Sequence, residues 1–308
     1  MIRYYYKNLR GDAVRELDAY HPGSWVYVEA PTNEEVDFLI NTFKLDRGHL
    51  EDALDPDEMP RLEREDELTY IFVRYAFTNQ ERDLTTAPFL FIVGQDLLIT
   101  IGLGQMPRLN RFLEGRLDFA TTQRTRLVLI ILDQMVDQYE VLINKVGRQI
   151  GVIRSRLKGQ GISNEDFIDF VMIEDELNEF LSALQPTTAI LRRLLLGRHV
   201  SLYNEDQDVV EDLLLNNEQS IEGCKSHVKS IVNIREAYAT ISSNNLNRTM
   251  KILTAATVLI TLPNVIFGMY GMNVTLPFQE EPWVFGAIVG AGLIIVFLVF
   301  FAARRRMY

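Results

Sequence analysis

A stripe of polar side chains on one predicted helix is the part of this sequence best suited to handling a cation. Side chains three or four residues apart lie on the same face of a helix. On this face the sequence places Asn247, Met250, Thr254 with Leu253 beside it, Thr257, Thr261 and Asn264. Close packing of small residues between membrane helices is one interpretation. We favour a pore lining, because an asparagine stands at each end of the stripe and a symmetric oligomer of such helices would enclose a pore.

A turn with the sequence Gly271-Met272-Asn273 follows Tyr270 at the predicted end of this helix. The last carbonyl groups of a helix lack intrahelical partners and carry the negative end of its dipole. Together with the amide oxygen of Asn273 they would form a collar of neutral oxygen acceptors in an oligomer. Such a collar suits a hard cation. Taken alone, the tripeptide is equally compatible with a simple glycine C-cap.

Two long segments without charged residues surround this turn and predict two membrane spans. The first runs from Ile252 to Gln279 and the second from Pro282 to Ala303. As a helix, the second segment is about 30 Å long, which matches the hydrocarbon thickness of a bilayer. The first segment is more polar, but its length and its neighbour favour a span as well. We expect spans at about 249–270 and 283–303, with an outside loop at 274–282.

The distribution of Lys and Arg predicts the orientation of these spans. Positive residues are absent from the connecting loop but flank the spans, as Arg248, Lys251, Arg304, Arg305 and Arg306. Both ends of the chain are therefore expected in the cytoplasm, with the spans in the inner or plasma membrane. The N-terminal sequence has no apolar core of a signal peptide. The outside loop carries Glu280 and Glu281, which would either concentrate cations or simply be solvated.

Composition narrows the class of function. The 308-residue chain has 31 Lys and Arg against 42 Asp and Glu, a net charge of -11, which disfavours nucleic-acid binding. Its single cysteine, Cys224, excludes an intrachain disulfide and fits a reducing compartment. The few scattered His predict no clustered soft-metal site. No phosphate-binding loop, zinc-protease motif or nucleophile set is recognisable, so we expect neither an enzyme nor an organic cofactor.

The remaining sequence predicts a mixed α/β domain followed by long helices. We expect strands at 24–31, 67–77, 89–94 and 96–102, and helices at 32–43, 49–55, 126–157, 164–196 and 201–268. The first helix opens with a capping box at Thr32, and the second is expected to stop before Pro56. The last helix would be roughly 100 Å long, so it implies a stalk. We therefore divide the chain into a mixed α/β domain at 1–122, a helical stalk at 123–247 and a membrane domain at 248–308.

The order of these features resembles the CorA family of divalent-cation channels. Tyr-Gly-Met-Asn follows a charge-free helix, and an acidic loop, a second span and a basic tail come after it. The resemblance implies a cytoplasmic α+β domain with a long stalk helix and two C-terminal transmembrane helices, assembled as a funnel-shaped homopentamer in the lipid bilayer. It also implies that the first span lines the pore and that Asn273 meets a hydrated divalent cation, usually Mg²⁺, with Co²⁺ and Ni²⁺ as further cargo.

The resemblance extends to regulation by cytoplasmic Mg²⁺. Leu50-Glu51-Asp52 resembles a family motif, and counting back from Asn273 places Asp212 at the partner position on the stalk helix. The resemblance implies a regulatory metal site between subunits formed by Asp52 and Asp212, with help from Glu51. Ordinary solvated acids on helix surfaces are the alternative.

The pore-lining face departs from the family pattern at two positions. Thr261 stands where the family commonly has a Met, and Asn264 where it commonly has a Thr. We therefore expect a short hydrophobic gate centred on Met250 and Leu253. Two alternatives to a Mg²⁺ channel remain at this point: a zinc transporter of the same superfamily and a membrane-anchored helical scaffold that conducts nothing.

Overall fold

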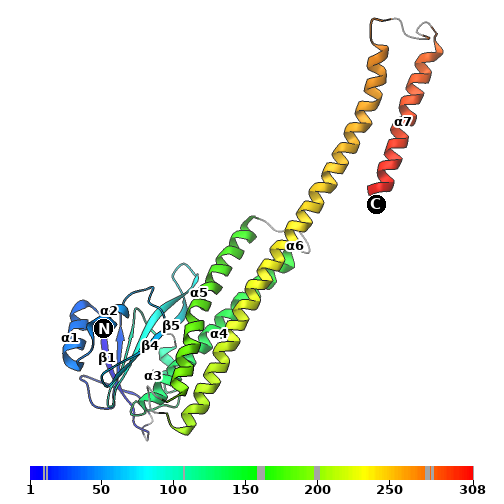
Figure 1. The fold of residues 1–308 in the computed structure, drawn as a ribbon. Helices are drawn as coiled ribbons and strands as arrows, with labels where there is room; N and C mark the ends of the chain where they lie inside the picture. Colours follow the sequence, from blue (N-terminus) through cyan, green and yellow to red (C-terminus); the bar gives the residue numbers. More distant parts are fainter. Residues whose placement is uncertain are drawn as a thin grey trace. The chain divides into compact units, whose positions relative to one another are not determined.

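The computed structural model of the protein describes residues 1–9, 11, 13–106, 108–157, 164–197, 202–274, 278 and 281–307. The chain forms two compact units, Met1–Asn233 and Ile234–Tyr308. The first unit is a sheet with helices on both faces, and the second contains two long apolar helical segments (Figure 1). The predicted α+β domain with a long helix and two C-terminal apolar helices is confirmed.

Seven strands form one mixed sheet in the first unit. They are β1 (Ile2–Tyr6), β2 (Arg15–Leu17), β3 (Trp25–Glu29), β4 (Arg61–Glu65), β5 (Leu68–Thr78), β6 (Leu84–Val93) and β7 (Leu98–Gly102). Their order is β2-β1-β3-β7-β6-β5-β4, and only the pairing of β3 with β7 is parallel. The predicted hairpin between β6 and β7 is confirmed, and it closes where the Gly94 N–H donates to the Leu97 carbonyl.

Helices cover both faces of this sheet, and each face has its own core. On one face lie α1 (Asn33–Phe43) and α2 (Arg47–Asp52), which bury Leu39 and Leu50 against Phe72 and Ile92. On the other face lie α3 (Leu109–Leu113), α4 (Arg124–Leu157), α5 (Asn164–Leu195) and the first part of α6 (Asn204–Tyr270). Because both faces are covered, the central strands are apolar throughout rather than alternating.

The predicted capping box is present, but the second predicted helix is displaced along the chain. The Thr32 hydroxyl accepts a hydrogen bond from the Glu35 N–H, and the Glu35 side chain accepts one from the Thr32 N–H. The second helix spans Arg47–Asp52 rather than 49–55. The side chain of Asp46 accepts a hydrogen bond from the His49 N–H and sets the start two residues earlier. The helix then ends at Asp52, without reaching Pro56.

Gly102 is held at its position by packing. A Cβ atom on Gly102 would lie 3.0 Å from Cδ2 of Phe89, a fully buried ring, and 3.2 Å from the Gly104 carbonyl oxygen. We expect Gly102→Ala to destabilise the first unit by about 1–3 kcal/mol, because neither neighbour has room to move. The measurement is the midpoint of thermal unfolding of the full-length protein in detergent.

Gly151→Ala is the matched control for that variant. Nothing lies within 4 Å of a Cβ added to Gly151 on α4. Alanine is a better helix former than glycine, so its midpoint should stay or rise slightly. Equal midpoints for the two variants would show that the packing around Gly102 does not constrain it.

Candidate functional site

The threonines of the predicted pore-lining stripe satisfy their hydroxyl protons within their own helix. The Thr254 hydroxyl donates to the Met250 carbonyl at 2.8 Å and the Thr257 hydroxyl to the Leu253 carbonyl at 2.9 Å. The Thr261 hydroxyl donates in the same way to the Thr257 carbonyl. This back-bonding removes the cost of placing a donor in an apolar environment, while each hydroxyl oxygen keeps lone pairs that can accept from water. The stripe therefore offers acceptors.

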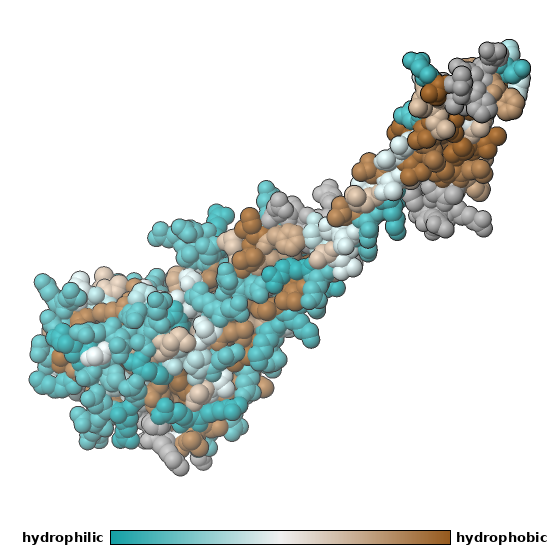
Figure 2. Space-filling model, turned by 45° about the horizontal axis from the view of Figure 1, so that its top comes forward, coloured by the Kyte–Doolittle hydropathy of each residue, from teal (hydrophilic) through white to brown (hydrophobic). Residues whose placement is uncertain are grey.

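The second unit exposes most of its apolar surface. The most apolar 18-residue segment of α6 has no part buried within the chain. The corresponding segment of α7 (Trp283–Met307) is only 11% buried. Met250 and Leu253 are 51% and 59% exposed. Brown, hydrophobic side chains gather over these segments in Figure 2. Surface of this kind requires a lipid or protein environment, and both helices are long and apolar enough to cross a membrane.

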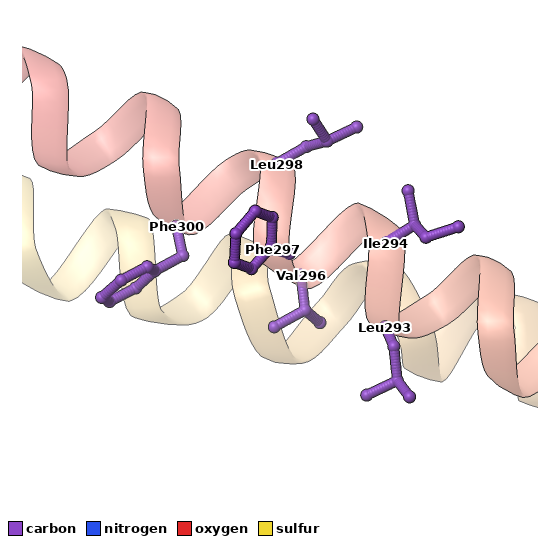
Figure 3. A pocket seen from close by; sticks show the side chains of 6 residues that line it. All are labelled: Leu293, Ile294, Val296, Phe297, Leu298 and Phe300. Atoms are coloured by element: carbon purple, nitrogen blue, oxygen red, sulfur yellow. The ribbon is translucent and has the colours of Figure 1, made fainter.

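Helix α7 is apolar on several sides. A groove of about 560 Å³ along it is lined by Leu293, Ile294, Val296, Phe297, Leu298 and Phe300. Figure 3 shows these side chains pointing away from α7 in different directions, with α6 alongside. A helix that is hydrophobic all round is typical of a membrane span. Close to the turn, the Phe267 ring lies 3.7 Å from where a Cβ on Gly292 would be, so the two helices are in contact.

Helix α6 ends in a tight turn that leads to Asn273. The Gly271 N–H donates to the carbonyls of Phe267 at 3.1 Å and Gly268 at 3.3 Å, and the Met272 N–H donates to Met269 at 3.4 Å. These carbonyls are thus partly satisfied, and each keeps one further lone pair for a ligand. Asn273 itself is exposed.

Gly271 is not a left-handed helix cap. Among the described glycines a positive φ occurs only at Gly23, Gly115 and Gly197. Gly271 directly follows the last residue of α6 and so stands at its C-terminal end, but without the left-handed conformation that favours glycine there. A Cβ at this position would meet only the Phe267 and Gly268 carbonyl oxygens, at 3.5 and 3.6 Å, which is ordinary contact. Among the described residues of one chain, nothing excludes a side chain there.

Within the acidic loop the structure describes Val274, Phe278, Glu281 and Pro282. Glu280 lies outside the described residues, whereas Glu281 is exposed and its N–H donates to the Phe278 carbonyl at 3.1 Å. Trp283 begins α7 and is 61% exposed. A tryptophan at this position is typical of a membrane interface.

Two of the three acids predicted to form the regulatory site, Asp52 and Glu51, already have partners within the chain. Asp52 Oδ2 lies 2.6 Å from Nη2 of Arg61, and Glu51 lies 3.8 Å from Nη1 of Arg47. The Arg61 guanidinium also contacts Glu58 and Glu63 and stacks 3.9 Å above the centre of the Phe72 ring. Asp52 is therefore held by a cation that it shares with Glu58 and Glu63.

One chain does not bring Asp52 and Asp212 together. Helix α2 packs into the core on one face of the sheet through Leu50, and α6 packs into the core on the other face through Leu213 (Figure 1). Asp212 is exposed on α6. A site containing both aspartates would need a second copy of the chain.

A cluster that contains an imidazole was not predicted from the sequence. Asp46, His49 and Glu65 each offer a ligand atom, and these atoms all lie within 4.8 Å of one another. The available signal was Asp46 three residues before His49, the spacing of a helix cap and its first turn. The contribution of Glu65 could not be foreseen, because β4 was not predicted as a strand.

The buried thiol of Cys224 plays no part in these sites. The side chain is fully buried, and burial raises its pKa to about 12. The thiol therefore stays protonated, which makes it a poor metal ligand.

Known proteins that resemble this chain do so over nearly its whole length. A cobalt/magnesium transport protein CorA of Methanocaldococcus jannaschii is 24% identical over 292 residues, which cover 91% of this chain and 90% of that protein. The complete structure of the CorA magnesium transporter from the same organism matches with a TM-score of 0.88 at 21% identity, covering 99% of this chain and 98% of that one.

A second solved structure shares the fold at greater distance. The full-length CmaX protein matches with a TM-score of 0.78 at 18% identity, over 99% of this chain and 97% of that chain. The family model described as "CorA-like Mg2+ transporter protein" matches residues 23–305, nearly the whole sequence. With its α+β domain, its long helix and its Gly-Met-Asn turn between two apolar helices, the chain belongs to the CorA-like Mg²⁺ transporter family.

Proposed function

We propose that the chain is a subunit of a channel that carries Mg²⁺, and with it Co²⁺ or Ni²⁺, across the cell membrane down the electrochemical gradient. The observation that carries this proposal is the turn at Gly271-Met272-Asn273, which ends an exposed apolar helix. The family membership supports Mg²⁺ as the transported ion. Transport requires no organic cofactor and no catalytic residue.

In this proposal the turn recognises the ion through its water. Hydrogen bonds from the inner-shell water of the ion are accepted by the amide of Asn273 and by the backbone oxygens from Tyr270 to Asn273. The ion therefore need not lose this water in order to bind. Neutral acceptors hold the ion weakly enough to release it. Glu280 and Glu281 raise the local cation concentration outside the turn.

Beyond the turn, the exposed stripe of α6 lines the pathway. Asn264, Thr261, Thr257 and Asn247 supply acceptors, and Met250 and Leu253 form a short hydrophobic constriction. The assembly is a homopentamer with both termini in the cytoplasm. Residues 1–122 and 123–247 form its cytoplasmic domain and stalk, and 248–308 form its membrane part, with spans at about 249–270 and 283–303 and the outside loop at 274–282.

Cytoplasmic Mg²⁺ closes the channel in this proposal. An ion between Asp52 of one subunit and Asp212 of the next, assisted by Glu51, neutralises their repulsion and holds the subunits together. Mg²⁺ must compete with Arg61 for Asp52, since the guanidinium already lies 2.6 Å from it. This competition would set the affinity of the sensor in a range where it can release the ion.

Removing either regulatory carboxylate is expected to abolish closure by Mg²⁺. In liposomes, Asp52→Asn and Asp212→Asn should keep conducting when Mg²⁺ on the cytoplasmic side is raised, whereas the unmodified protein should slow. Asp57→Asn, an exposed aspartate beyond α2, is the matched control and should slow normally. If both regulatory variants close like the control, the site lies elsewhere.

The transport proposal itself is tested by ion flux through purified protein in liposomes. An Mg²⁺ indicator inside the vesicles should report entry that depends on the protein and on the gradient. Parallel measurements with Zn²⁺, with and without a proton gradient, separate Mg²⁺ transport from zinc transport. If no divalent ion crosses, the non-conducting scaffold becomes the better account.

A further inference from the structure

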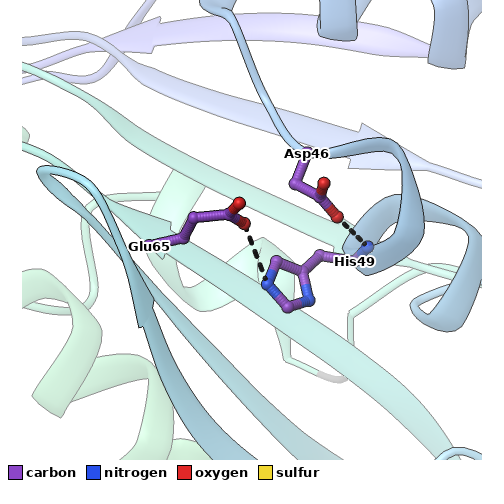
Figure 4. Close-up of side chains that lie close together, drawn as sticks. All are labelled: Asp46, His49 and Glu65. Atoms are coloured by element: carbon purple, nitrogen blue, oxygen red, sulfur yellow. Dashed lines mark hydrogen bonds and ion pairs between the residues drawn. The ribbon is translucent and has the colours of Figure 1, made fainter.

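Helix α2 holds the imidazole of His49 beside carboxylates from another part of the chain. Nε2 of His49 lies 3.4 Å from Oε2 of Glu65 and 3.7 Å from Oε2 of Glu63. Figure 4 shows Glu65 reaching the imidazole from the end of β4, while Asp46 stands at the start of α2. We propose that Asp46, His49 and Glu65 bind a divalent transition-metal ion of the Co²⁺, Ni²⁺ or Zn²⁺ type, at a site separate from the transport pathway.

The fold fixes the imidazole before any ion binds. His49 lies against the Tyr70 ring, with 4.3 Å between ring centroids, and its side chain is only 13% exposed. Asp46 is fixed as well: its N–H donates to the Tyr70 hydroxyl at 3.2 Å and its Oδ1 accepts from the His49 N–H at 2.9 Å. The second carboxylate oxygen of Asp46 remains available to bind a metal ion. Two of the three groups are therefore preorganised, which lowers the cost of binding.

The third group is the adjustable one. Glu65 ends β4, where it pairs with Leu68 of β5, and its side chain is 51% exposed. The three ligand atoms lie within 4.8 Å of one another, which is wider than a coordination sphere. The exposed Glu65 side chain can rotate toward an ion that His49 and Asp46 hold. The 3.4 Å between Glu65 and His49 is already close to the separation of about 3.3 Å between ligand atoms on a tetrahedral metal.

An ion has open access to this position. A cleft of about 350 Å³ is lined by Phe43 to Asp46, Glu65 to Leu68 and Tyr70, so that two of the three ligands lie on its wall. The turn that borders it carries Glu65, Asp66 and Glu67, against one lysine, Lys44. This excess of negative charge attracts cations into the cleft.

The ligand set selects against Mg²⁺. Imidazole nitrogen suits Zn²⁺, Ni²⁺ and related ions, whereas Mg²⁺ takes oxygen ligands and keeps several waters. One imidazole and two carboxylates leave further positions for water. The proposed transport pathway has no described histidine, so the two sites differ in chemistry as well as in place. The proposal holds whether or not the channel function does.

The test is titration of full-length protein in detergent with Co²⁺, followed by its visible d–d absorption. His49→Gln should weaken the absorbing site about tenfold or more, since even indirect support of a metal ligand is worth that much. Asp46→Asn removes a charged ligand but retains the helix cap, because asparagine caps equally well. It should weaken Co²⁺ binding without lowering the midpoint of thermal unfolding. A large excess of Mg²⁺ should not displace the bound Co²⁺.

Two matched variants control for the loss of a histidine and of a charge. His21→Gln removes an exposed imidazole, and Glu67→Gln removes a carboxylate from the same turn that is not part of the proposed ligand set. Both should titrate like the unmodified protein. Equal Co²⁺ curves for His49→Gln and the unmodified protein would overturn the proposal and leave a plain histidine–carboxylate ion pair. Mg²⁺ flux in the same His49→Gln protein should be normal, so a failure here is distinguishable from a failure of the transport proposal.

Discussion

Replacing Asn273 with alanine is expected to reduce Mg²⁺ flux by about 10- to 100-fold. The substitution removes an amide that would accept from water bound to a doubly charged ion, and the net loss of one hydrogen bond of this charged class, about 1.5–3 kcal/mol, corresponds to this factor. Because Asn273 is exposed beyond the end of α6 in the single chain, its loss should not affect folding. The measurement is initial Mg²⁺ entry into liposomes containing equal amounts of each protein.

Two further variants test whether the loss of flux is specific to the turn. Asn233→Ala changes an exposed asparagine in the first unit and should leave flux unchanged. Gly271→Ala adds a methyl group where the chain itself leaves ordinary contact distances of 3.5 and 3.6 Å. A loss of flux in Gly271→Ala with an unchanged unfolding midpoint would mean that neighbouring copies crowd this turn. Normal flux in both Asn273→Ala and Gly271→Ala would refute the proposal that this turn recognises the ion.

Replacing Leu253 with serine is expected to open the pathway at rest. A hydrophobic constriction stops ions by excluding water, so a hydroxyl at its centre should let water and then ions pass. The measured quantity is Mg²⁺ leak at high Mg²⁺ on the cytoplasmic side, where the proposed regulation closes the unmodified channel. We expect the leak to rise by about tenfold, the equivalent of about 1.4 kcal/mol off the barrier.

Ile252→Ser is the matched control for this effect. Ile252 is the preceding residue on α6, is 47% exposed and lies off the stripe. The same loss of apolar surface there should leave the resting leak unchanged. If Leu253→Ser keeps both the conductance and the resting leak of the parent, the gate is not at Leu253.

The long helices were predicted from sequence within a few residues because their pattern is sustained. Helix α5 was expected at 164–196 and spans Asn164–Leu195, and α6 was expected at 201–268 and spans Asn204–Tyr270. Over so many turns a helical period outweighs any local ambiguity. The two candidate spans followed from composition alone.

The strands at the sheet edge could not be predicted in the same way. Strand β4 has the sequence RLERE, and only Leu62 within it is buried. Such a strand carries no alternating pattern, since an edge strand is defined by its pairing with a neighbour, here β5.

Strand β6 was expected to begin at Phe89 but begins at Leu84, where Glu179 on α5 accepts hydrogen bonds from Thr85 and Thr86. That support comes from a residue far along the chain.

The same limit applies to the candidate sites. The turn after α6 was recognised because its residues are contiguous in sequence. The group around His49 was not, because it joins a helix cap to the end of an unpredicted strand. Nor could the sequence reveal that Asp52 is paired with Arg61, which again depends on β4.

The single parallel pairing in the sheet has a consequence for biogenesis. Strands β4 to β7 pair with their sequence neighbours, so this meander can form locally, and β3 pairs with β1; joining the two parts requires Trp25 to pair with Leu98. Non-local pairing of this kind slows folding. During synthesis at about 5–20 residues per second, the ribosome completes β7 many seconds before the two apolar segments at the end of the chain emerge. The order of elements therefore gives the sheet time to close before the chain is engaged by the membrane-insertion machinery.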